Sequence, residues 1–163
     1  MLVADRAVRS DGPESEGQIP GITVGIDGSH NASHALEWAM TEAALRKAPL
    51  TVITVNSVAA SYWTGNPVTV PADEERLAKV RKQADEAVAT TAAKLGTAQP
   101  ASVTITALHG FPAKTLIDAS EDCDLLVVGT RGGGGFGSLT LGSVSSQVVH
   151  HARCPVVVVP AGE

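Results

Sequence analysis

Five short runs rich in β-branched residues alternate along this chain with four segments of helical periodicity. The runs comprise residues 21–27, 50–58, 102–108, 124–129 and 155–159. The run "DLLVVG" at 124–129 is apolar almost throughout, as in a central parallel strand that is covered on both faces. Strands that alternate with helices form parallel sheets with right-handed crossovers. The pattern therefore predicts an open α/β sheet.

The segments between the runs carry apolar faces at helical spacing. Both Ser29 and Asn31 are available as N-cap of the first helix, and Gly96 can terminate the second. Pro112 suits the first position of a short third helix over 112–120, and a fourth is expected from about Ser143 to Ala152. The apolar face of the first helix comprises Ala32, Ala35, Leu36, Ala39 and Ala43. That of the second helix comprises Leu77, Val80, Ala84, Ala87, Val88, Thr91 and Leu95.

Length and composition set the broad class. The 163 residues suggest one domain, and 44% hydrophobic residues with 3% aromatics predict an aliphatic core. Residues 1–18 are polar and are expected to form a disordered tail before a domain over 19–163. A net charge of -5 argues against nucleic acid as a partner. The sequence shows no apolar run long enough for a membrane span and no signal-peptide pattern, so a cytoplasmic protein is expected.

Six glycines lie between Gly132 and Gly142, immediately after the fourth predicted strand. In open α/β sheets, ligands bind beyond the carboxyl ends of the strands. This loop also leads into a helix N-terminus, where unpaired N–H groups and the helix dipole favour an anion. Ser143 adds a hydroxyl donor at the helix start. These features predict a phosphate site, and the alternative is a flexible connection.

Two well-known phosphate motifs are matched only in part by this loop. Gly132, Gly134 and Gly137 satisfy G-x-G-x-x-G, but they lie in the last crossover instead of the first βα turn. Gly137, Gly142 and Ser143 fit the P-loop pattern without its lysine. The chain also has no Asp, Glu or His between Gly129 and Val149. Fast phosphoryl transfer is therefore not expected, and no catalytic residue is assigned.

Histidines and cysteines offer no convincing metal site in the sequence. His30 and His34 have the i, i+4 spacing of a zinc helix, but no glutamate follows the first histidine and no third ligand is evident. Cys123 and Cys154 lack metal-type spacing and are interpreted as buried thiols in a reducing compartment.

A longer pattern, G-x2-G-x9-G-[ST], fits Gly129, Gly132, Gly142 and Ser143 throughout. Together with "VGIDGS", "HGFPAKTLIDAS" and "HHARCPVVVV" in the same order, it resembles the universal stress protein family over residues 19–160. The resemblance implies a doubly wound five-stranded parallel sheet in the order 3-2-1-4-5, with helices on both faces. It also implies an ATP-binding stress-response regulator, and a homodimer through an edge strand at 155–159.

The resemblance assigns nucleotide contacts to particular residues. Asp27 would bond the ribose, Asn56 and Ser57 would meet the adenine, and Gly129 would lie under the ribose with Arg131 nearby. The phosphates, with Mg²⁺ as a companion ion, would be held by the amides of Gly132, Gly142, Ser143 and Val144 and the hydroxyls of Ser143 and Ser145.

Several alternatives stay open at this point. Asp27 can merely cap the following turn, and Asn56 and Ser57 can be ordinary strand-end residues. The same scaffold can bind cyclic AMP, whose single phosphate would leave part of the loop empty. Slow ATP hydrolysis is a further alternative, whereas a true ATP-cleaving ligase or hydrolase would call for an added catalytic acid or lysine in the loop. A purely structural domain would have no need of the glycines.

Overall fold

The computed structural model describes residues 2–4, 21–57, 73–131 and 141–160. Six strands form one sheet in the order β1-β6-β5-β2-β3-β4. The elements along the chain are β1 (Leu2–Ala4), β2 (Ile22–Ile26), α1 (His30–Arg46), β3 (Pro49–Ser57), α2 (Glu74–Leu95), β4 (Ser102–Gly110), α3 (Pro112–Ala119), β5 (Leu125–Gly129), α4 (Ser143–His151) and β6 (Val156–Val159).

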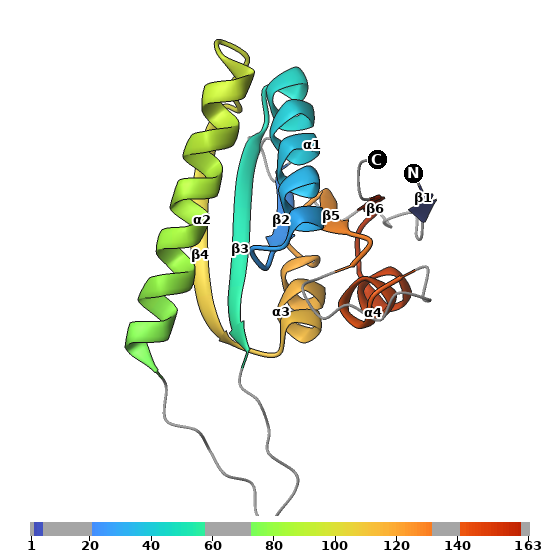
Figure 1. The fold of residues 1–163 in the computed structure, drawn as a ribbon. Helices are drawn as coiled ribbons and strands as arrows, with labels where there is room; N and C mark the ends of the chain where they lie inside the picture. The colour runs from blue at the N-terminus through green and yellow to red at the C-terminus, as the bar shows by residue number, and fades with distance from the viewer. Residues whose placement is uncertain (1, 5–20, 58–72, 132–140, 161–163) are drawn as a thin grey trace, which may run out of the picture.

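The five strands from β2 onward are mutually parallel, and β2 lies between β3 and β5. Numbered from β2, their order is the predicted 3-2-1-4-5. This confirms the doubly wound fold (Figure 1). The chain order changes direction between β2 and β5, so their carboxyl ends mark the point where this fold class binds ligands.

Each face of the sheet carries its own apolar core. Successive residues of β5 point to opposite faces, so Leu125 and Val127 join one core while Leu126 and Val128 join the other. The first core packs against α1 and α2, and includes Leu36, Met40 and Val52. The second packs against α3 and α4 and includes Leu116 and Val148. The aliphatic composition expected of the core is confirmed.

Local signals place the two long helices where the sequence predicts them. The Ser29 hydroxyl accepts a hydrogen bond from the Ala32 N–H at 3.2 Å and caps α1. Asp73 caps α2 in the same way through the Arg76 N–H, at 3.0 Å. Gly96 ends α2 with a φ of +63°, a backbone conformation that favours glycine.

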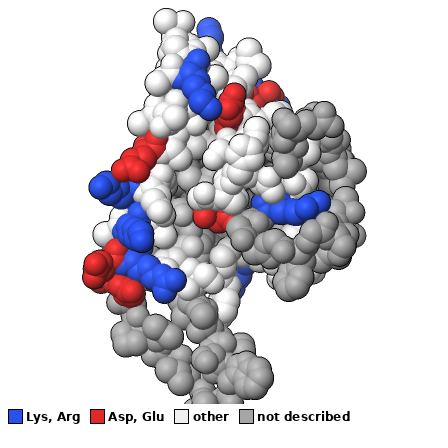
Figure 2. Space-filling view, viewed as in Figure 1, with Lys and Arg blue, Asp and Glu red and all other residues white. Residues whose placement is uncertain are grey.

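The charged residues of α2 lie on its solvent face. Arg81 and Asp85 are 3.6 Å apart, and Lys82 and Glu86 are 3.9 Å apart, in each case one helical turn from one another. Figure 2 shows basic and acidic side chains interleaved along this helix. Exposed pairs of this kind contribute little to stability, so this face of α2 serves mainly to keep the helix solvated.

The prediction that residues 155–159 form an edge strand is wrong. β1 pairs antiparallel with β6, with Val3 opposite Val157, and takes the edge position itself (Figure 1). Residues 2–4 therefore depart from the disordered tail expected for 1–18, while residues 5–18 lie outside the described part of the chain. Three apolar residues are enough to pair with the open edge of β6 and to hydrogen bond backbone groups that would otherwise be unpaired there.

No helix within the described ranges is both long and apolar enough to cross a membrane.

Candidate functional site

The predicted site residues gather at the carboxyl edge of the sheet. Asp27 follows β2, Asn56 and Ser57 end β3, and Gly129 ends β5. Parallel strands end at one edge of a sheet, so these residues come from separate parts of the chain to the same side of the molecule. Gly132 and the rest of the glycine-rich loop through residue 140 lie outside the described residues.

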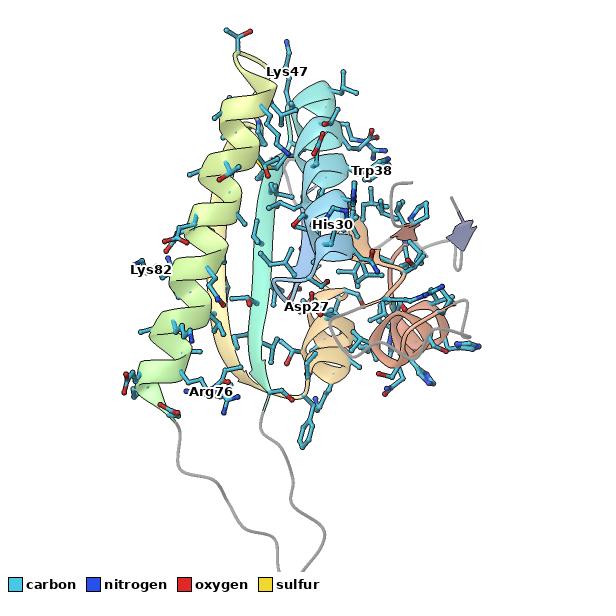
Figure 3. The ribbon with its side chains drawn as sticks, viewed as in Figure 1. Asp27, His30, Trp38, Lys47, Arg76 and Lys82 are labelled. Atoms are coloured by element: carbon cyan, nitrogen blue, oxygen red, sulfur yellow. The ribbon has the colours of Figure 1, made fainter. Side chains whose placement is uncertain are left out.

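Asp27 lies where β2 runs into α1, below His30 on the first turn of the helix (Figure 3). Its Oδ1 accepts a hydrogen bond from the Ser29 N–H at 3.0 Å, and the side chain is exposed. Gly28 between them has a φ of +78°. The local geometry supports the capping interpretation of Asp27. It also holds the carboxylate at the end of the strand.

A cavity of about 80 Å³ opens beside Asp27, between α1, α2 and the ends of β2 and β3. Its lining combines apolar and polar side chains, as small-molecule sites commonly do. The contribution of α2 was not predicted, because Val80 and Ala87 were assigned only to the apolar face of that helix. The lining residues are Ile26, Asp27, Gly28, Ser29, Ala32, Ser33, Leu36, Thr54, Val55, Val80, Gln83, Ala84 and Ala87.

Gly129 ends β5 and lies against the first turn of α1. A Cβ built on Gly129 would lie 3.0 Å from the carbonyl oxygen of Asn31 and 3.1 Å from its carbonyl carbon. Both atoms belong to the backbone of the first turn of α1. The glycine therefore lets α1 approach β5 closely, a packing role that the sequence analysis did not assign to it.

The start of α4 is tied to the residues that follow β5. The Gly142 N–H donates to the Thr130 carbonyl at 2.7 Å, and the Ser145 hydroxyl reaches the same carbonyl at 2.9 Å. Ser145 is buried and also donates to the Gly142 carbonyl at 3.1 Å. These two groups were expected to bind phosphate. In this structure they have internal partners, and they fix the ends of the glycine-rich loop.

The first turn of α4 leaves its N–H groups without acceptors inside the helix. The first hydrogen bond within the helix runs from the Ser146 N–H to the Gly142 carbonyl at 2.9 Å, so Ser143, Val144 and Ser145 have no intrahelical acceptor. No side-chain hydrogen bond caps α4 among the described residues. The Ser143 side chain is exposed. This helix end therefore offers the donor set that an anion requires.

The remaining predicted residues lie around this edge in different environments. Asn56 is buried, and its Nδ2 lies 3.2 Å from Nδ1 of His109 on the neighbouring strand β4. Because an amide nitrogen donates, Nδ1 of His109 is the acceptor in this contact. Ser57 and Arg131 are exposed. Asn56 is thus held by a cross-strand contact, one residue before the end of β3 at the site.

His30 and His34 contact each other through their Nε2 atoms at 3.1 Å, on the exposed face of α1. Their rings meet edge to face, with centroids 4.6 Å apart. Across residues 2–4, 21–57, 73–131 and 141–160, no three His, Cys, Asp or Glu side chains are grouped to hold a metal ion.

The chain is similar to known proteins in both sequence and fold. Residues 20–160 match the model of the universal stress protein family. A universal stress protein of Mycolicibacterium smegmatis is 36% identical over 139 residues, which cover 85% of this chain and 47% of that protein. This chain thus spans about half the length of the first curated relatives that it matches.

Solved structures show the same fold. The universal stress protein UspA from Lactobacillus plantarum superposes with a TM-score of 0.69 at 25% identity, covering 88% of this chain and 99% of that one. A universal stress protein in complex with cAMP superposes with a TM-score of 0.63, also at 25% identity, covering 90% of this chain and all of that one. The chain therefore belongs to the universal stress protein family.

Proposed function

We propose that this protein binds ATP at the carboxyl edge of its sheet and acts as a nucleotide-sensing regulator of a stress response. The observation that carries the proposal is the first turn of α4, which no side chain of the described residues caps and which lies next to the end of β5. Gly129 brings that strand end against the first turn of α1, whose Ser29 and Ala32 line the neighbouring cavity. An anion site and a small-molecule cavity are thus adjacent.

In this proposal each part of the nucleotide has its own contacts. The Asp27 carboxylate accepts a ribose hydroxyl, and the strand end at Asn56 and Ser57 meets the adenine. The phosphates, with Mg²⁺, lie against the N–H groups of Ser143 and Val144, and Arg131 supplies the nearest positive charge. The Gly142 N–H and the Ser145 hydroxyl position these donors through their hydrogen bonds to the Thr130 carbonyl.

Cyclic AMP is the second candidate, because a family member of the same fold was solved in complex with it. Its single phosphate needs fewer donors than the first turn of α4 provides together with the glycine-rich sequence that precedes it. ATP uses more of them, so we favour ATP. Titration calorimetry with ATP, ADP, AMP and cAMP ranks these ligands directly. We expect ATP to bind at roughly micromolar strength, about -8 kcal/mol.

Two substitutions at Ser143 separate the roles of its hydroxyl and its N–H. Ser143→Ala removes the hydroxyl alone and is expected to cost about 1–2 kcal/mol of ATP binding. Ser143→Pro also removes the N–H, and should bind ATP at least about tenfold more weakly than the alanine variant. Proline is favoured at the first position of a helix. Gly142 before it is extended, with φ -74° and ψ 168°, which proline accepts in a preceding residue.

Adenosine provides the control for this pair, because it has no phosphate to meet the N–H of Ser143. Its affinity should be the same for both variants, and their thermal midpoints should agree with that of the wild type. Equal ATP affinity in the proline and alanine variants would contradict the phosphate site. A steady release of phosphate at about 1 s⁻¹ or faster, within the ordinary range of enzymes, would favour an ATPase over a sensor.

We also propose that two copies associate as an isologous dimer through residues 155–159. Because β1 covers this side of β6, the second copy has to displace β1 and pair in its place. Light scattering at tens of micromolar should then give twice the mass of the chain, and Val157→Lys should reduce it to the mass of one. A wild-type protein that stays monomeric under these conditions would rule this interface out.

A further inference from the structure

Two buried cysteines meet at the end of the sheet opposite the proposed nucleotide site. Cys123 lies between α3 and β5, and Cys154 lies between α4 and β6, each two residues before its strand. Their Sγ atoms are 3.6 Å apart. Both thiols are free and buried within the second apolar core. The sequence analysis interpreted them as buried thiols in a reducing compartment, but it could not show that they face each other.

The two thiols are chemically different. The pKa of the Cys123 thiol lies below its ordinary value, chiefly because Cys154 donates a hydrogen bond to it, with further hydrogen bonds from Thr23 and the backbone at Leu125. The pKa of Cys154 is raised well above its ordinary value, first by that same hydrogen bond and then by burial. Its Sγ also lies 3.4 Å from the Pro155 carbonyl oxygen, a second acceptor for its proton. Of the two thiols, Cys123 is therefore the one that loses its proton more readily.

We propose that Cys123 and Cys154 form a reversible intramolecular disulfide when the protein meets hydrogen peroxide. The Cys123 thiolate attacks one peroxide oxygen, the O–O bond breaks, and the hydroxide that leaves takes up a proton to become water. Cys123 is then a sulfenic acid. The sulfur of Cys154 attacks the Cys123 sulfur, the S–S bond forms, and the S–O bond breaks. The departing hydroxide takes the Cys154 proton and leaves as a second water.

The reaction needs little movement of the chain. A disulfide requires an S–S separation of about 2.05 Å, so the two sulfurs approach by roughly 1.5 Å in total. β5 and β6 are adjacent parallel strands, with Leu126 opposite Val156. The two cysteines precede these neighbouring strands, and the Sγ separation of 3.6 Å places them for a bond between them.

The bond would enclose the part of the chain that carries the anion site. Residues 123–154 include β5, the glycine-rich sequence and the whole of α4. A covalent link at the amino ends of β5 and β6 would restrict this segment in the unfolded chain without touching the carboxyl edge. The oxidised protein is therefore expected to unfold at a higher temperature. This inference does not depend on which nucleotide the protein binds.

The test oxidises the folded full-length protein with hydrogen peroxide, quenches it, and alkylates it under denaturing conditions. We expect a mass about 2 Da below that of the reduced chain and no alkylation. After trypsin without reductant, the peptide 115–131 should remain joined to 154–163, because cleavage follows Lys114, Arg131 and Arg153. Dithiothreitol should restore two alkylatable thiols. Two thiols that stay reactive to the alkylating agent, or a link between two chains, would overturn the proposal.

Single variants test which of the two cysteines reacts with peroxide first. The measurement is the oxidation state of the remaining cysteine, which a purely structural role of either residue would not change. In Cys154→Ser, oxidation should stop at Cys123, with a gain of about 16 or 32 Da on that residue. In Cys123→Ser, the remaining thiol should stay reduced at the same peroxide dose. If circular dichroism shows that serine disturbs the fold, Cys123→Ala and Cys154→Ala take the place of the two serine variants. Oxidation of Cys154 in the absence of Cys123 would show that the assigned asymmetry is wrong.

Discussion

Leu126→Ala is expected to lower the free energy of unfolding by about 2–5 kcal/mol. Leu126 lies in the middle of the sheet on β5, is fully buried, and points into the core beneath α3 and α4. Truncation removes buried methyl groups and leaves a cavity that neighbouring strands on both sides cannot close. Domains of this size are commonly stable by only about 5–15 kcal/mol, so one such change takes a large share of the total.

Urea unfolding followed by circular dichroism measures this effect. Leu45→Ala is the matched control, because Leu45 is 76% exposed on α1. It should change stability by no more than about 0.5 kcal/mol. A loss below about 1 kcal/mol for Leu126→Ala would mean that α3 and α4 settle onto the sheet and fill the space. The description of a close-packed second core would then be wrong.

Gly129→Val should remove nucleotide binding and destabilise the fold as well. The first atom of any side chain at this position would stand 3.0 Å from the Asn31 oxygen. Backbone cannot rotate away as a side chain can, so α1 has to move off β5. Overpacking of this kind typically costs about 1–3 kcal/mol. The shift also displaces Ser29 and Ala32, which line the cavity.

Gly21→Ala is the control for this substitution. A Cβ at Gly21 would meet its nearest neighbour, Cγ of Pro49, at an ordinary 3.6 Å. It should therefore leave both unfolding and ATP binding close to the wild type. Gly129→Ala should fall between the control and valine in both measurements. Undiminished ATP binding in Gly129→Val would separate the cavity from the nucleotide site and contradict their proposed adjacency.

Much of this fold could be predicted because its signals are local. The apolar faces of α1 and α2 follow helical spacing, and both contain the residues that the structure buries, such as Leu36 and Ala84. Caps at Ser29 and Gly96 depend only on neighbouring residues. The strand order came from the resemblance of four motifs to a known family, since periodicity alone does not order parallel strands.

The parts that were not predicted depend on contacts between distant residues. The pairing of Val3 with Val157 joins the two ends of the chain, and no pattern within Leu2–Ala4 indicates it. The site shows the same limit. The sequence places Gly142 and Ser145 in the predicted phosphate site, but only the structure shows that the Gly142 N–H and the Ser145 hydroxyl donate to the Thr130 carbonyl. Likewise, the spacing of Cys123 and Cys154 gives no sign that their sulfurs meet.

Coverage of β6 by a strand of its own chain has a consequence for how the protein responds to dilution. A strand that belongs to the same chain is present at an effective concentration that the connecting length of chain sets. That value does not change with the amount of protein in the cell. The valines of β6 thus keep a partner even when the chain is scarce. A second copy, in contrast, competes only as strongly as its own abundance allows, so the proposed self-association would measure how much of this protein has accumulated.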